Sequence, residues 1–261
     1  MKVVAGILSG SVSILSEAIH SGMDLLAAII AFFSVKLSDT PPDKQHPYGH
    51  GKYENVSGVI EAVLIFIAAG WIIFEAIEKL IEPGSIDNVE IGVVVMAVSS
   101  IVNFFVSRRL YAVAKETDSI ALEADALHLK TDIYTSVGVA TGLLLIRLTG
   151  WHFLDPVAAI LVALLILKES YHLLKNAYSP LIDASLAEDE QNIIDEVITG
   201  KNLTYHQLRT RKSGHYRFAD LHLEMPGNTP LADVHRLCDE IEHDIKSKLN
   251  HMEINIHVEP V

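Results

Sequence analysis

Two histidine–aspartate pairs with the same spacing are the residues of this sequence best suited to binding a metal ion. His20 precedes Asp24 by four residues, as His128 precedes Asp132, and both pairs lie in long apolar stretches. Residues four apart lie on one face of an α-helix, so each pair can direct an imidazole and a carboxylate at one point. Two pairs together supply a suitable tetrahedral ligand set for Zn²⁺. Because ionisable groups in a membrane usually mark an ion or proton pathway, the pairs predict transport of a divalent metal.

A purely structural role is the alternative, since His and Asp also join membrane helices through polar contacts. The repetition of the pair favours metal binding. Glu17 and Asp125 lie one turn before the two histidines. They are candidates for proton carriers or entrance groups, or are simply solvated at the helix ends.

A second group of candidate ligands lies in the loop before the next apolar stretch. Asp43, His46 and His50 are accompanied by prolines and glycines, which can fold the loop back so that the three side chains converge on one ion. The alternative is a solvated loop with incidental histidines. Lys52 and Glu54 follow, and we expect them to position the start of the helix or to pair with other charges.

A third group of candidate ligands lies in the polar last third of the chain. Its members are His206, His222, His235, His257 and Glu259. Strand alternation places His257 and Glu259 on one face of a strand. The first two histidines lie on other predicted strands and can meet them across a sheet or across a dimer interface. The alternative is a chance scatter of surface histidines, but their density in strands favours metal.

The composition agrees with a membrane protein that handles cations. The chain has 261 residues, of which 50% are hydrophobic, and a mean hydropathy of +0.31. Its net charge of -13 argues against a nucleic-acid partner. Cys238 is the single cysteine, which excludes an internal disulfide and sites built from four thiolates.

The apolar segments predict an α-helical membrane bundle. Spans need about 20 mostly apolar residues, and we expect five, at residues 12–37, 55–80, 88–112, 119–147 and 155–176. Residues 1–8 form a shorter apolar stretch that looks like the stump of a sixth. Lysines and arginines gather on the side that carries the 38–52 loop, the 113–118 turn and the C-terminal part, which is therefore expected to be cytoplasmic.

The C-terminal part is predicted to be a separate domain. We assign residues 1–182 to the transmembrane domain and 183–261 to a cytoplasmic metal-binding domain. The hydrophobic pattern of the latter predicts the order α-β-β-α-β, a small α+β sandwich of ferredoxin-like or metallochaperone-like type, at residues 186–200, 204–211, 216–224, 230–249 and 252–258. Such a small core would gain stability from dimerisation or bound metal.

Four segments, in order along the chain, resemble the cation diffusion facilitator family. They are the runs 10–24, 46–54 and 123–132, and the tail segment 206–214 with 222–225. The resemblance covers essentially the whole chain. It implies a homodimeric exporter in the cell (inner) membrane, not an enzyme, that exchanges cytoplasmic zinc, or cadmium, cobalt, iron or manganese, for protons.

The resemblance also implies roles for single residues. His20, Asp24, His128 and Asp132 would form the transport site. The loop residues Asp43, His46 and His50 would hold a second ion, and the tail histidines with Glu259 would bind metal at the dimer interface. Lys52 would pair with Asp183. The family has six spanning helices, so the resemblance leads us to expect that the first is missing here.

The chemistry of such a site needs no covalent step. Protons compete with metal for imidazole and carboxylate, so metal affinity falls with pH, and we expect the site to load metal inside and protons outside. An intramembrane metalloenzyme is one alternative, but His-Glu-x-x-His is absent and four protein ligands would close the coordination shell. A membrane-tethered metal sensor is another.

Overall fold

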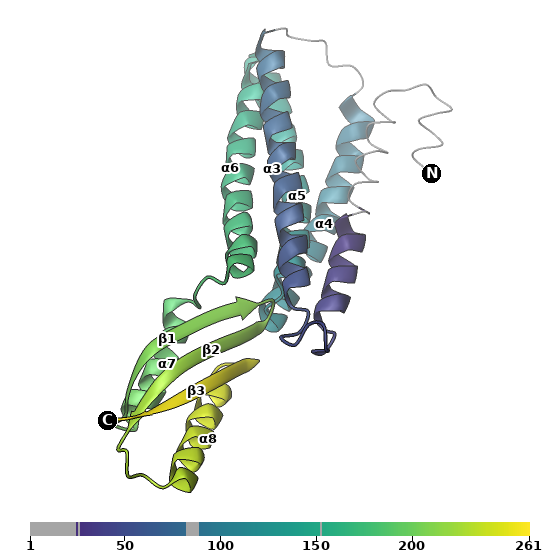
Figure 1. Ribbon diagram of the computed structural model, residues 1–261. Coiled ribbons are helices and arrows are strands. Elements are labelled where there is room, and N and C mark those ends of the chain that lie inside the picture. The colour runs from purple at the N-terminus through teal and green to yellow at the C-terminus, as the bar shows by residue number, and fades with distance from the viewer. Residues whose placement is uncertain (1–24, 26, 82–88, 152) are drawn as a thin grey trace.

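The computed structural model describes residues 25, 27–81, 89–151 and 153–261, which form a helical bundle and a smaller α+β unit (Figure 1). His20, Asp24 and Glu17 lie outside the described residues, and so do the apolar stretch 1–8 and most of the expected span 12–37. A short apolar helix, Ala27–Ser38, is the described part of that span.

Four long helices make up the rest of the bundle: α3 (Lys52–Ile81), α4 (Val89–Thr117), α5 (Ile120–Thr149) and α6 (Leu154–Tyr178). With 25 to 30 residues each, they measure roughly 38–45 Å and exceed the hydrocarbon thickness of a bilayer. Large apolar side chains such as Trp71 and Phe74 point outward and are exposed. A lipid environment accounts for this outward apolar surface, which water would not favour.

Two segments within the described residues combine the length, hydropathy and low charge of a membrane span, Lys52–Glu78 and Pro156–Ile182. Helix α5 is as long but carries several charges, among them Asp125, Lys130 and Asp132. The helical character of the domain is thus as expected, and the number of five spans stays a prediction. Helix α4 continues to Thr117, past the predicted end at residue 112.

Small residues bring the helices of the bundle close together. Ala62 and Ala69 of α3 and Ala124 of α5 are fully buried in one apolar cluster, with Ile65 and Ile166 around them. The Ser170 hydroxyl of α6 donates a hydrogen bond of 2.7 Å to the Ala62 carbonyl. Small side chains and interhelical hydrogen bonds are the usual means of packing helices in membranes.

The α+β unit follows a 3₁₀ turn (Ser179–Ile182) and has the predicted order α-β-β-α-β. Its elements are α7 (Glu188–Gly200), β1 (Thr204–Ser213), β2 (Tyr216–Met225), α8 (Leu231–Lys248) and β3 (Met252–Pro260). The sheet order is β1-β2-β3, with β1 antiparallel to β2 and β2 parallel to β3.

Strand alternation divides the sheet into two faces. Leu221 and Leu223 of β2 are fully buried against Ile194 of α7 and Ile241 of α8. The even-numbered residues of β2, such as His222, point away from this core and are only partly buried. Both helices therefore cover one face, and the opposite face is left to the histidines and carboxylates.

Candidate metal centres

The bundle and the α+β unit meet at the turn between β1 and β2. The Gly214 amide donates a hydrogen bond of 2.9 Å to the Asn55 side chain of α3. A Cβ atom on Gly51 would lie 2.1 Å from the Ser213 carbonyl oxygen, so this contact is backbone against backbone. Gly214 has φ +59°, which glycine adopts at little cost.

Ion pairs surround this docked turn. Asp118, between α4 and α5, accepts from Lys212 (2.8 Å) and from Arg217 (2.7 Å). The largest influence on the pKa of Arg217 is burial, which opposes ionisation, but its carboxylate partners Glu190 and Asp118 outweigh this and raise the pKa. The junction is therefore held by a partly buried network of charges.

Lys52 and Asp183, the pair implied by the resemblance, lie in contact at this junction. The Lys52 Nζ atom is 2.9 Å from the Asp183 Oδ1 atom, and Arg211 adds a second cation 3.6 Å from the same oxygen. The hydrogen bond from Lys52, followed by the charges of both cations, lowers the pKa of Asp183. Glu54, also singled out, does not join these cations: it is buried and accepts from the Ser38 and Ser119 hydroxyls.

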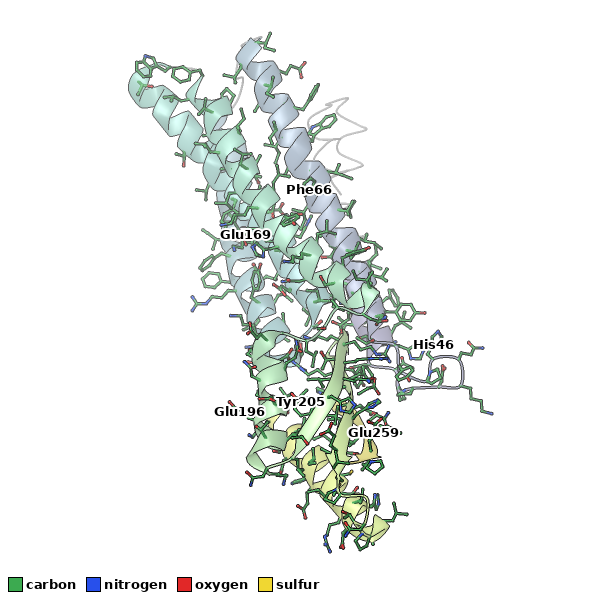
Figure 2. All side chains as sticks on the ribbon, turned by 60° about the vertical axis from the view of Figure 1, so that its left-hand side comes forward. His46, Phe66, Glu169, Glu196, Tyr205 and Glu259 are labelled. Atoms are coloured by element: carbon green, nitrogen blue, oxygen red, sulfur yellow. The ribbon has the colours of Figure 1, made fainter. Side chains whose placement is uncertain are left out.

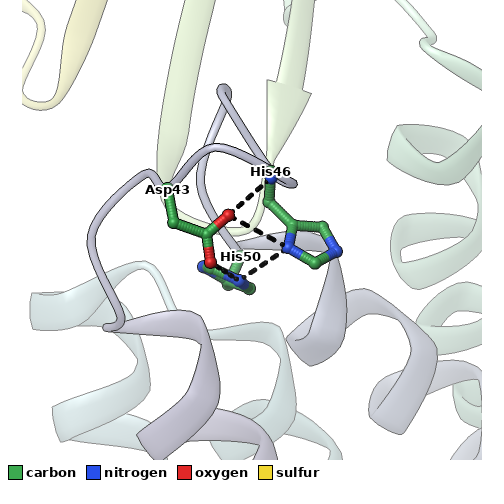
Figure 3. A group of neighbouring side chains, drawn as sticks. All are labelled: Asp43, His46 and His50. Carbon is green, nitrogen blue, oxygen red and sulfur yellow. Dashed lines mark hydrogen bonds and ion pairs between the residues drawn. The ribbon is translucent and has the colours of Figure 1, made fainter.

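The loop residues Asp43, His46 and His50 converge on one point (Figure 3). One ligand atom from each lies within 4.8 Å of the others. The His50 Nε2 atom lies 3.0 Å from His46 Nδ1 and 3.6 Å from Asp43 Oδ2. Two imidazoles and a carboxylate leave one tetrahedral position for water or a further ligand, which suits Zn²⁺.

Backbone contacts hold two of these side chains in place. The His50 Nδ1 atom lies 3.2 Å from the Thr40 carbonyl, a contact that places the proton on Nδ1 and leaves Nε2 free to bind metal. The Asp43 carboxylate accepts from the backbone amides of His46 (2.7 Å) and Gln45 (2.8 Å). The His46 amide contributes most to lowering the pKa of Asp43, so this ligand is ionised at neutral pH.

A second group forms on the open face of the sheet, where His206, His222 and Glu259 each bring a ligand atom within 4.8 Å of the others. Glu259 joins the two histidines: its Oε1 atom lies 2.9 Å from His222 Nδ1 and its Oε2 atom 3.2 Å from His206 Nε2. The strand register explains the convergence, because His206, His222 and His257 are aligned across β1, β2 and β3.

The other two predicted tail ligands differ in position. His257 lies beside the group, with its Nε2 atom 3.7 Å from Glu259 Oε1. His235 lies on α8, is largely exposed and contacts Asp239 at 3.6 Å; it is not part of the group within one chain. Figure 2 shows Glu259 in the α+β unit and His46 on the loop beside the junction, so the two sites are separate.

The structure describes one half of the predicted transport site. His128 and Asp132 lie on α5 and are partly buried in the bundle. The Asn103 amide of α4 lies 3.5 Å from Asp132 Oδ2. How these residues sit relative to the other pair stays a prediction, because His20 and Asp24 lie outside the described residues.

Sequence reasoning missed two carboxylates, Glu224 beside the sheet group and Asp118 at the junction. Glu224 lies 3.2 Å from His206 Nδ1 and faces Glu259 in the strand register. The signal was present, because Glu224 follows His222 by two residues and therefore shares its face. Asp118, which links Lys212 and Arg217, gave no such signal, since its partners are about a hundred residues away in the sequence.

Comparison with known proteins finds matches for both parts of the chain. Residues 1–182 match the cation efflux transmembrane domain and residues 186–261 match the cation efflux protein cytoplasmic domain. An uncharacterized transporter of Synechocystis is 36% identical over 264 residues, covering 100% of this chain and 85% of that protein. The cation-efflux pump FieF of Shewanella oneidensis is 32% identical over 263 residues, covering 100% and 88%.

Among solved structures, the metal-bound C-terminal domain of the CzcD transporter from Thermotoga maritima is 28% identical. It covers 28% of this chain and 87% of its own, with a TM-score of 0.27. The two domain matches and the full-length relatives show that this chain belongs to the cation diffusion facilitator family, whose members are cation efflux transporters and not enzymes.

Proposed function

We propose that this chain exports a divalent cation, zinc in the first place, from the cytoplasm in exchange for protons. The observation that carries the proposal is the pair His128 and Asp132 on one helix inside the bundle of a cation efflux protein. With His20 and Asp24 they would form the transport site. Nitrogen and carboxylate ligands without thiolates suit zinc, and also cadmium, cobalt, iron or manganese at lower preference.

Proton exchange follows from the chemistry of these ligands. An imidazole binds either a proton or a metal ion, and its ordinary pKa near neutrality makes the choice sensitive to the pH on each side of the membrane. A site that opens alternately to the two sides would take up metal where protons are scarce and release it where they are abundant.

The two outer groups are proposed to be accessory metal sites. The loop group lies next to α3 at the bundle's cytoplasmic end, and the sheet group lies on a partly exposed face. We propose that this face meets a second copy of the chain in a homodimer, where the largely exposed His235 and His257 would complete the coordination.

The experiment that tests the proposal is zinc flux into sealed vesicles that contain the full chain and an internal zinc indicator. We expect flux driven by a proton gradient, and its loss in Asp132→Ala. His172→Ala is the matched control, since His172 is exposed on α6. Stoichiometric zinc binding without flux in any condition would contradict export and favour the sensor.

A further inference from the structure

A row of buried polar side chains runs along one face of α3. Glu54, Ser57 and Glu61 are spaced by three and four residues, so they lie above one another on the helix. Each has a relative exposure of 2% or less. This row lies in a helix that is otherwise apolar enough to cross a membrane.

The cytoplasmic end of the row lies beside a cavity, which it reaches through Ser119. Glu54 accepts hydrogen bonds from the Ser38 hydroxyl at 2.6 Å and from the Ser119 hydroxyl. Ser119 lines a cavity of about 490 Å³ between the bundle and the α+β unit, together with Asp118 and Lys212. A cavity of this size with charged walls holds water.

The inner end of the row is unusual, because its polar atoms have no hydrogen-bond partner among the residues that the structure describes. Both carboxylate oxygens of Glu61 and the hydroxyl of Ser57 make no hydrogen bond within the described residues. Buried polar groups are almost always bonded to protein or to ordered water. An unpartnered ionised carboxylate in such surroundings is costly. A bound proton or an ordered water molecule, or the two in turn, would stabilise Glu61 where the described residues offer no partner.

The groups that face Glu61 support an exchange of protons there. On α5, Asp125 acts on Glu61 electrostatically, so a proton on either carboxyl relieves their repulsion. On α6, the hydroxyl of Ser170 donates its hydrogen bond to the Ala62 carbonyl and not to Glu61. No cation is paired with Glu61 in the part of the chain that the structure describes, and a bound proton would neutralise it.

The depth of Glu61 places it between the cavity and the predicted transport site. Helices α3 and α5 start side by side, where Ser119 bonds Glu54. With a rise of 1.5 Å per residue, Glu61 lies about 10 Å and His128 about 13 Å above these starting points. A proton that leaves the level of the transport site for the cytoplasm thus meets Glu61 on its way.

We propose that Glu54, Ser57 and Glu61 line a hydrated proton path and that Glu61 relays to the cytoplasm the proton that metal displaces from the transport site. In each cycle the Oε–H bond of Glu61 breaks toward a water molecule beside Ser57, and the proton leaves past Glu54 through the cavity. Glu61 is left as a carboxylate until a proton from the outer side restores it. This inference rests on the proposed function and assigns its cytoplasmic proton route.

Two measurements on the full chain test the inference. The first is infrared difference spectroscopy of the protein titrated with acid and base in the absence of zinc, which detects the C=O band of a protonated carboxyl group. The second is zinc flux in vesicles under a proton gradient, with internal indicators for zinc and pH. The variants are Glu61→Gln, Glu61→Asp and Glu61→Leu, and the control is Glu78→Gln, an exposed carboxyl on the same helix.

We expect Glu61→Gln to lose one carboxyl band and to slow proton-driven zinc flux by on the order of 10-fold or more, with little change in zinc affinity. Glu61→Asp should restore part of the flux. Glu61→Leu removes an unpartnered polar group, so it should raise the unfolding temperature while flux stays low. A purely structural role predicts instead that flux follows stability.

The outcomes separate the two proposals. An unchanged band in Glu61→Gln overturns the inference whatever the flux, and so does unaltered proton coupling in that variant. If the wild-type chain shows the Glu61 band but moves no zinc against protons, the proposed function fails, whereas Glu61 stands as a buried proton-binding group.

Discussion

Replacing Glu259 by Gln should remove the proposed metal site on the sheet without unfolding the sheet. The carboxylate contacts three histidines, at 2.9 Å from His222, 3.2 Å from His206 and 3.7 Å from His257. Gln keeps the shape but loses the charge and one ligand oxygen. Loss of groups that merely support metal ligands costs 10–100-fold in affinity, so loss of this ligand should cost about 100-fold or more, roughly 2.7 kcal/mol.

The stability of the zinc-free protein should change far less. Glu259 and its histidine partners are about one-third or more exposed, and exposed ion pairs contribute about 0–1 kcal/mol. Zinc at 100 times the wild-type dissociation constant should stabilise the site by about 2.7 kcal/mol in the wild type, but by only about 0.4 kcal/mol in Glu259→Gln.

The assay is a zinc titration of the full chain by calorimetry, combined with thermal unfolding with and without zinc. Both are done in a His50→Ala background, which removes the loop site. Glu253→Gln is the matched control, because Glu253 lies on the same strand and face and is exposed. Equal zinc stoichiometry and equal zinc-induced stabilisation in the two variants would refute the assignment of Glu259 as a ligand.

Three further predictions concern the loop, the junction and the pH. His50→Ala should abolish zinc binding by the loop, seen as one fewer zinc ion per chain in the titration. The control His172→Ala should bind as many zinc ions as the wild type. An unchanged number of zinc ions in His50→Ala would exclude the loop site. Asp118→Asn should weaken the junction by about 1 kcal/mol after allowance for the exposure of Asp118, and amide hydrogen exchange at residues 212–217 should become faster. The control is Asp233→Asn, which changes an exposed acid on α8. Equal exchange rates in the two variants would contradict the role of Asp118. Burial lowers the pKa of His215 from its ordinary 6.5, so the unfolded chain binds the proton more readily, and stability is lost as the pH falls below about 6.5 toward the lower folded pKa. His215→Gln should therefore reduce the change of the unfolding temperature with pH between pH 5 and 7. An unaltered slope would show that other groups cause the pH dependence.

The sequence predicted the α+β unit well because its hydrophobic pattern is regular. Alternation in 216–224 and 252–258 gave the strands and also their two faces. The pattern allowed His222 and Glu259 to meet across the sheet, with a meeting across a dimer interface as the alternative. The left-handed Gln207, at φ 52°, did not follow from it. This residue lies where the β1–β2 register shifts, and such a shift depends on how the partner strand pairs.

The bundle was predictable in kind but not in its polar interior. Long apolar runs indicate helices, yet they do not show which side chains face inward once several helices pack. Glu61 carried a usable signal, a lone acid within the apolar run of α3, which in a membrane indicates function. The partners of Asp118 could not be predicted, since these contacts join distant segments and form only when the two domains dock. The pairing of Lys52 with Asp183 was expected from the family resemblance alone.

Because the turn between β1 and β2 is docked on the bundle, the far end of the sheet should report movements of the helices. Gly214 in the turn and Gly51 just before α3 allow backbone to touch backbone, so the turn is expected to follow a tilt of α3. Strand β2 then extends ten residues, roughly 33 Å, away from the bundle. A tilt of a few degrees at the helix ends is thereby enlarged to a shift of a few ångströms at residues 226–230. A fluorescent or spin label at that end would record motions in the bundle without being placed inside it.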